Sequence, residues 1–168
     1  NEDSTNQTIN ITSQSQLNRF NGTDKLDNSQ RFLYGINFTT KHISTNFSQN
    51  YEFDSKSDYN KEIGNSRNLS DALFSTSINY VNTNIEHDLR YSPHLEKIRS
   101  QSVSLTNKNI LGKFDISYFD EKKESNNILT SGKETFELNF VSNKINKFST
   151  INFKSLYDLV DDKADEYV

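Results

Sequence analysis

The chain has 168 residues, of which 32% are hydrophobic and 25% are charged, and its net charge is −4. So low a hydrophobic fraction is unusual for a domain with a continuous core, yet twelve Phe and eight Tyr are more than a disordered chain carries. Lysines and acids are mixed along the whole length, so no basic stripe exists that would favour nucleic acid as a partner. No run approaches the ~18 apolar residues of a membrane-spanning helix, so any crossing of a membrane has to use strands.

Alternation of apolar and polar residues with a period of two dominates the sequence and predicts half-buried β-strands. In chain order the predicted strands are NQTINITSQSQ (6–16), then 31–40, 42–53, 72–80, 83–91, 102–106, 113–119, 136–140 and 149–159. Many of them span roughly 9–11 residues, and no segment has a convincing helical period. The fold class predicted is therefore all-β, an antiparallel meander of about nine long strands.

The predicted connections alternate strictly between short and long. Short joints are expected near Thr40–Lys41, Asn82–Thr83, Asn107–Gly112 and Asn143–Asn146, and long polar connections over 17–30, 54–71, 92–100 and 120–133. Outer-membrane barrels have short turns at one end and long loops at the other, whereas a soluble sandwich mixes connection lengths. Strands of ~9–11 residues also fit a tilted membrane strand better than an ordinary globular one. The pattern favours a segment of a transmembrane outer-membrane β-barrel.

A barrel segment would turn its apolar phase to lipid and its polar phase to a wet lumen. In TNIEHDLRY (83–91), Ile85 and Leu89 alternate with charged residues, and only His87 breaks the phase. The predicted lipid-facing residues are Phe38, Phe47, Ile78, Ile85, Leu89, Ile116, Leu138 and Phe153. The predicted lumen-facing residues are Asn46, Ser48, Glu86, Asp88, Arg90, Asn139, Asn152 and Lys154.

No motif for catalysis, cofactor binding or metal binding stands out. His42, His87 and His94 are too scattered for a metal motif, and the nucleophile-elbow and phosphate-loop patterns are absent. Five acids at the end of the chain lack the spacing of a calcium loop and predict a solvated loop: Asp158, Asp161, Asp162, Asp165 and Glu166. With no Cys there are no disulfides or thiolate metal sites. We therefore expect no enzyme, no cofactor and no metal.

Three segments within residues 42–168 resemble the C-terminal barrel region of the LptD family, the outer-membrane lipopolysaccharide-assembly proteins. In NFSQNYEFDSKSDYNKEIGNSRNLSDALFSTSINY, a strand end is followed by a long loop, and then Gly64, Arg67, Ser70 and Asp71 open the next strand. HDLRYSPHLEKIRSQSVSLT resembles the following hairpin. NKFSTINFKSLYDLVDDKADEY resembles a later strand, with Phe148 where Trp is common in the family.

The resemblance implies a location in the outer membrane of a Gram-negative bacterium and a role in lipopolysaccharide transport into the outer leaflet. It implies outer-membrane lipid and lipopolysaccharide as partners, together with a plug lipoprotein and periplasmic bridge proteins. Residues 1–168 would then be one partial barrel domain, truncated at both ends. Two alternatives stay open: a generic porin or receptor barrel, and a soluble surface-exposed all-β binding domain whose aromatic residues pack between two sheets.

Overall fold

The structure, a computed structural model, describes residues 5–6, 10, 20–21, 30–53, 67–125, 127–143, 149–160 and 163–167. These residues form strands and turns without a helix. A two-stranded sheet pairs β1 (Thr5–Asn6) with β2 (Phe20–Asn21). A nine-stranded sheet contains β3 (Arg31–Thr39), β4 (Ile43–Glu52), β5 (Ala72–Tyr80), β6 (Thr83–Ser92), β7 (Lys97–Lys108), β8 (Gly112–Ser125), β9 (Ile128–Ser142), β10 (Asn152–Asp158) and β11 (Lys163–Tyr167).

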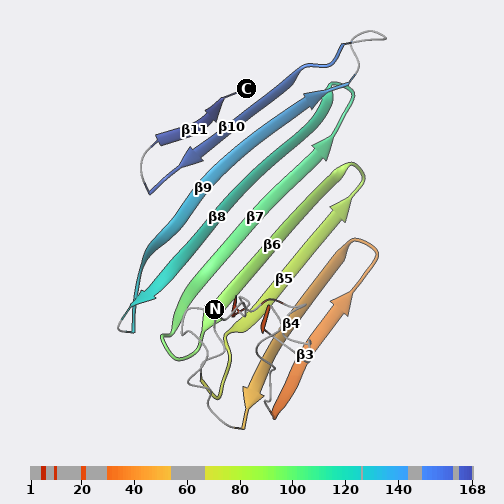
Figure 1. Cartoon of the computed structure of the whole chain (residues 1–168). Coiled ribbons are helices and arrows are strands. Elements are labelled where there is room, and N and C mark those ends of the chain that lie inside the picture. Colours follow the sequence, from red (N-terminus) through yellow and green to blue (C-terminus); the bar gives the residue numbers. More distant parts are fainter. Residues whose placement is uncertain are drawn as a thin grey trace.

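The nine strands lie side by side in chain order, each antiparallel to the next, as Figure 1 shows. The predicted all-β antiparallel meander is therefore confirmed. The order ends at β3 on one side and at β11 on the other, and in the described residues these two strands do not pair with each other. The sheet is thus open, with a free edge at each end.

The bounds of β3, β4, β5 and β6 agree with the predicted strands to within one residue, but β7, β8 and β9 are longer than predicted. The expected long connections over 92–100 and 120–133 are wrong, because β6 and β7 run on to a tight turn at 93–96, and β8 runs on to Ser125 before β9 begins at Ile128. Glu96 and Asn127 close these turns with φ of 53° and 62°, a conformation that Asn tolerates well. The extra strand residues were missed because most of them are polar, and the few apolar ones, such as Ile98, Ile128 and Leu129, do not recur with a period of two. Opposite charges face each other there, as in the pair of Glu121 with Lys133.

Two further expectations fail near the end of the chain. The joint expected at Asn143–Asn146 is longer, since β10 begins at Asn152, and residues 144–148 lie outside the described part. The acidic cluster is not one loop: Asp158 ends β10, while Asp165 and Glu166 belong to β11. Asp161 and Asp162 lie outside the described residues. Most of the strand expected at 6–16 also lies outside them.

The strands are staggered along the sheet. The paired residues Thr45, Thr76, His87, Val103 and Tyr118 form one line across β4 to β8. We count residues along each strand from this line to the end that adjoins a short turn. The count is two in β4 (to Ile43), four in β6 (to Thr83) and six in β8 (to Gly112). The ends therefore shift by two residues for every two strands crossed. With ~3.4 Å per residue and ~4.8 Å between strands, the strands tilt by roughly 35° from the perpendicular to the row of turns.

Gly35 in β3 is required by the close approach of β4. A Cβ at this position would lie 2.4 Å from the Phe47 carbonyl oxygen and 3.3 Å from the Ser48 Cα. Both are backbone atoms, so relief requires that β3 move away from β4. We expect Gly35→Ala to lower the free energy of unfolding by about 1–3 kcal/mol, as measured by urea unfolding followed by far-UV circular dichroism. Leu33→Ala, on the same face of the same strand, is the control, and an equal effect of both changes would contradict the steric explanation.

Candidate functional site

The pairing register sorts the predicted site residues onto two opposite faces, because directly paired residues point to the same side of a sheet. All eight predicted lipid-facing residues share one side, here called the apolar face: Phe38, Phe47, Ile78, Ile85, Leu89, Ile116, Leu138 and Phe153. All eight predicted lumen-facing residues share the other side, here called the polar face: Asn46, Ser48, Glu86, Asp88, Arg90, Asn139, Asn152 and Lys154. What each face contacts is a separate question.

An aliphatic row runs across the apolar face. Its members are paired in succession from β4 to β9: Ile43, Ile78, Ile85, Leu105, Ile116 and Leu138. Rings lie on both sides of this row, with Phe47 and Phe74 at 4.9 Å between centroids and Phe114 and Phe140 at 4.4 Å. The face is thus apolar over six neighbouring strands.

No second layer of the described chain covers the apolar face. Ile36 is 71% exposed, Phe38 58% and Phe153 45%, and the only buried hydrophobic residues of the described part are Ala72 and Leu73. Soluble monomers rarely expose contiguous apolar patches of more than a few hundred Å². A face of this extent therefore needs a cover, which can be lipid or another protein layer.

Polar residues interrupt the apolar face at a few positions and border it on β8 and β9. Thr45, Thr76 and His87 are paired in succession within it, and the two threonine hydroxyls lie 3.3 Å apart. His87, the expected exception, thus stays on this face, between Thr76 and Val103. Farther from the short turns, Asp120 pairs with Glu134, and the Tyr118 hydroxyl donates a 2.9 Å hydrogen bond to Glu134. On β8 and β9 the apolar zone therefore ends at a tyrosine next to charged residues.

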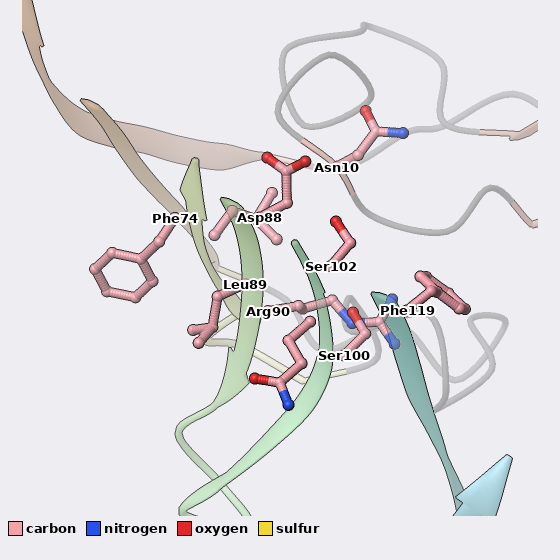
Figure 2. Close-up of a pocket in the computed structure, with 10 residues that line it drawn as sticks. Asn10, Phe74, Asp88, Leu89, Arg90, Ser100, Ser102 and Phe119 are labelled. Carbon is pink, nitrogen blue, oxygen red and sulfur yellow. The ribbon is translucent and has the colours of Figure 1, made fainter. Parts of the chain in front are cut away.

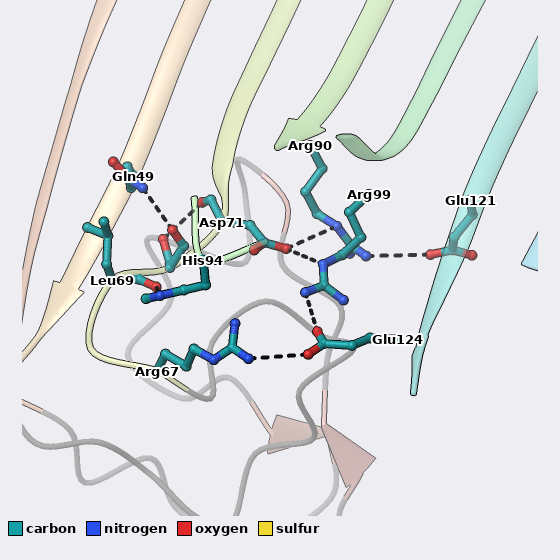
Figure 3. A network of polar contacts seen from close by, with 10 residues as sticks. Gln49, Arg67, Leu69, Asp71, Arg90, His94, Arg99, Glu121 and Glu124 are labelled. Carbon is teal, nitrogen blue, oxygen red and sulfur yellow. Dashed lines mark hydrogen bonds and ion pairs between the residues drawn. The ribbon is translucent and has the colours of Figure 1, made fainter. Parts of the chain in front are cut away.

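A buried ion-pair network lies at the end of the sheet opposite the short turns (Figure 3). Arg99 is at its centre and is 1% exposed. Its Nε lies 2.8 Å from Asp71 Oδ2, and its Nη2 donates a 2.6 Å hydrogen bond to Glu124 Oε2. Arg90 lies 3.5 Å from Asp71 and 3.8 Å from Glu121, and Arg67 lies 3.3 Å from Glu124.

The network holds the segment 67–71 against the sheet. Besides the pairs of Arg67 and Asp71, Gln49 Nε2 donates a 2.8 Å hydrogen bond to the Ser70 carbonyl, and His94 Nε2 lies 2.8 Å from the Leu69 carbonyl. Three arginines face three carboxylates, so the charges within the network balance. The network therefore acts as a structural clamp that joins strands β4, β6, β7 and β8 to the segment before β5. It leaves no unbalanced charge for a ligand.

Sequence reasoning found Arg90 and missed Arg99 and Glu124. A β-bulge explains the omission of Arg99: Arg90 pairs with Ser100 and Tyr91 pairs with Ile98, so Arg99 is an extra residue outside the period-two pattern. The sequence did single out part of this network in another way. Arg67, Ser70 and Asp71 are among the residues that resemble the LptD family, and all three lie in or beside the network.

The buried network predicts a pH dependence of stability. Burial raises the pKa of the Asp71 carboxyl above its ordinary value of 3.8, although Arg99 and Arg90 oppose this shift. The folded state therefore binds the Asp71 proton more tightly than the unfolded state does. The stabilisation that this proton gives to the fold is complete below the unfolded pKa and is lost as pH rises through the folded pKa. We expect the native chain to lose free energy of unfolding relative to the Asp71→Asn variant as pH rises through this range. Urea unfolding of both chains at a series of pH values measures the difference. A difference that grows with pH would contradict the sign.

A pocket of about 410 Å³ opens on the polar face beside the network (Figure 2). The side chains that line it from the polar face are Leu73, Asp88, Arg90, Ser100, Ser102 and Phe119. Asn10, which lies outside the nine-stranded sheet, also lines it. Phe74, Leu89 and Gln101 complete the lining from strands β5, β6 and β7, and Phe74 and Leu89 point to the other side in Figure 2. Within the described ranges no group of three His, Asp or Glu residues could hold a metal ion.

Comparison with known proteins adds no family. No protein-family model matches the chain, and no curated protein matches it in sequence. Among the described residues, no helix is long and apolar enough to span a membrane. The geometry of the two faces therefore has to support any functional proposal.

Proposed function

We propose that the chain is a segment of an outer-membrane β-barrel that serves lipopolysaccharide transport into the outer leaflet. The apolar face would contact the hydrocarbon of the bilayer, and the polar face would line a hydrated lumen. No bond is made or broken in this role. The segment works as a scaffold that keeps a polar path next to an apolar wall.

The observation that carries the proposal is the uncovered apolar face opposite a polar face, on the same strands. Ile116 on β8 is 37% exposed within the aliphatic row, while its neighbour Ser117 pairs with Ser104 and Glu137 on the polar face. Strict alternation of this kind is the pattern of a wall between lipid and water. A soluble sandwich would instead cover the face with a second sheet, and the described chain provides none.

The stagger of the strands supports a barrel wall. Closed barrels need strands that tilt by about 35–45° from the axis. The tilt of roughly 35° that follows from the register lies at the edge of this range. In lipid the free edges of β3 and β11 need partners, because an open edge leaves unpaired backbone groups at a high cost, and the edges of further strands or of other copies of this chain can supply them.

Lipopolysaccharide as the transported molecule rests on the resemblance to the LptD family alone. A porin or receptor barrel would share the two faces and the tilt, and it remains the alternative. The discriminating measurement between them is cross-linking to lipopolysaccharide from the polar face in cells. Capture of lipopolysaccharide at Ser104 but not at Leu105 would support transport, whereas capture at neither position would favour the porin alternative.

The membrane location is tested by labelling two adjacent residues. Since the chain has no Cys, Ile116→Cys and Ser117→Cys each give a single thiol for an environment-sensitive fluorophore. After refolding into liposomes, we expect blue-shifted emission from the label at Ile116 and water-like emission from the label at Ser117. Water-like emission from both labels, with the chain recovered outside the liposomes, would refute the proposal and favour the soluble alternative.

A further inference from the structure

Phe119 is the one aromatic residue on the polar face of the described strands. It pairs with Ser102 on β7 and with Thr135 on β9, and Ser102 in turn pairs with Asp88. From Ser75 on β5 to Asp158 on β10, every other residue of this row carries a small hydroxyl or a carboxylate. A phenyl ring in such a row cannot be explained by packing in a core, since only Ala72 and Leu73 are buried hydrophobic residues in the described part.

Asp88 is the free acid of this pocket. It is exposed, and in the described structure its carboxylate has neither a hydrogen bond nor an ion pair. Asp115 on the same face is different, because it accepts a 2.7 Å hydrogen bond from Thr106 and lies 2.8 Å from Lys113 Nζ. Asp88 lies two strands away from Phe119, or roughly 10 Å along the row. Ser102 lies between them.

The remaining charges of the pocket are already satisfied. Arg90 is buried and forms ion pairs with Asp71 and Glu121, so it does not offer a free cation to an anionic ligand. Lys133 Nζ lies 6.0 Å from the centre of the Phe119 ring, so one side of the ring already has a cation near it. What the pocket offers to a ligand is a ring surface, the carboxylate of Asp88 and the hydroxyls of Ser100 and Ser102.

We propose that this pocket binds a sugar ring. The C–H groups on one side of a pyranose can stack on the phenyl ring of Phe119, while its hydroxyls donate to the Asp88 carboxylate and exchange hydrogen bonds with Ser100 and Ser102. A few well-placed polar groups beside an aromatic surface are typical of a ligand site, and a volume of about 410 Å³ lies within the usual range. The inference deepens the proposed function, on which it rests for its location inside a lumen, by assigning the polar face a saccharide subsite.

The test is a titration of the full 168-residue chain, refolded in detergent micelles, with lipid-free core oligosaccharide released from lipopolysaccharide. Binding is measured by NMR from the shifts of isotope-labelled Phe ring signals. We expect Asp88→Asn and Phe119→Leu each to weaken binding by about tenfold, because each removes a contact made to the sugar. The matched controls are Asp115→Asn, on the same face outside the pocket, and Phe114→Leu, on the apolar face; both should bind as the native chain does.

Three results would overturn the subsite: no binding by the native chain, equal weakening by the variants and their controls, or shifts confined to rings on the apolar face. Circular dichroism of each variant checks that a loss of binding is not a loss of fold. The liposome labelling experiment is independent of this titration. A chain that inserts into liposomes but binds no sugar would refute the saccharide subsite and leave the barrel proposal standing. A chain that shows the expected binding pattern but does not insert would refute the barrel proposal and leave the subsite standing.

Discussion

Replacing Arg99 with methionine should lower the free energy of unfolding by about 3–5 kcal/mol, the usual cost of breaking a buried ion pair. Arg99 bridges Asp71 and Glu124, whose side chains are 3% and 1% exposed. Methionine fills a similar volume but leaves both carboxylates without their closest partner. Arg90 remains 3.5 Å from Asp71, and Arg67 remains 3.3 Å from Glu124, so the loss should fall short of full desolvation of both acids. Urea unfolding followed by far-UV circular dichroism measures the change.

Lys113→Met is the matched control. Lys113 lies 2.8 Å from Asp115, a distance equal to that between Arg99 and Asp71, but its side chain is 46% exposed. Exposed pairs contribute roughly 0–1 kcal/mol because water already solvates both charges. Arg99→Lys should recover only part of the loss, since one ammonium cannot reproduce contacts made by two separate guanidinium nitrogens. A loss below about 1 kcal/mol for Arg99→Met would show that the network is not a clamp.

The all-β meander could be predicted because its strands are apolar on one face only. On β4, Ile43, Phe47 and Tyr51 share one face and the opposite face is polar throughout, a period of two that indicates a half-buried strand. The same argument fails at Lys122–Ser125, where both faces of β8 are polar and the sequence resembles a loop. Strand pairing there depends on backbone hydrogen bonds and on the partner strand, which local patterns do not contain.

The polar network could not be predicted for a different reason. Its central residue, Arg99, is brought to Asp71 by a β-bulge and to Glu124 by the extension of β8, and neither has a signal of period two. The two faces could be predicted from alternation alone. Once β8 was recognised as a strand, Ile116 and Ser117 had to lie on opposite faces. Whether a face meets lipid is a property of its surroundings, and it requires an experiment that separates the two faces.

Ile116→Arg and Ser117→Arg provide that separation, since they introduce one side chain at adjacent positions of β8. At Ile116 the guanidinium would enter the middle of the aliphatic row, between Leu105 and Leu138. An Arg at the mid-plane of a bilayer costs about 2–4 kcal/mol on the lipid face of a barrel. We therefore expect Ile116→Arg to reduce insertion into liposomes strongly, as measured by co-flotation with the vesicles and by the refolded fraction.

Ser117→Arg should insert nearly as well as the native chain. The new guanidinium would lie opposite Glu137 on the polar face, where a hydrated ion pair changes stability by at most about 1 kcal/mol. The two variants carry the same added charge at adjacent positions of β8, and the new side chains lie on opposite faces of the sheet. Equal insertion by both would refute lipid contact at the apolar face. Loss of a water-soluble fold by Ile116→Arg alone would instead identify a second protein layer as the cover.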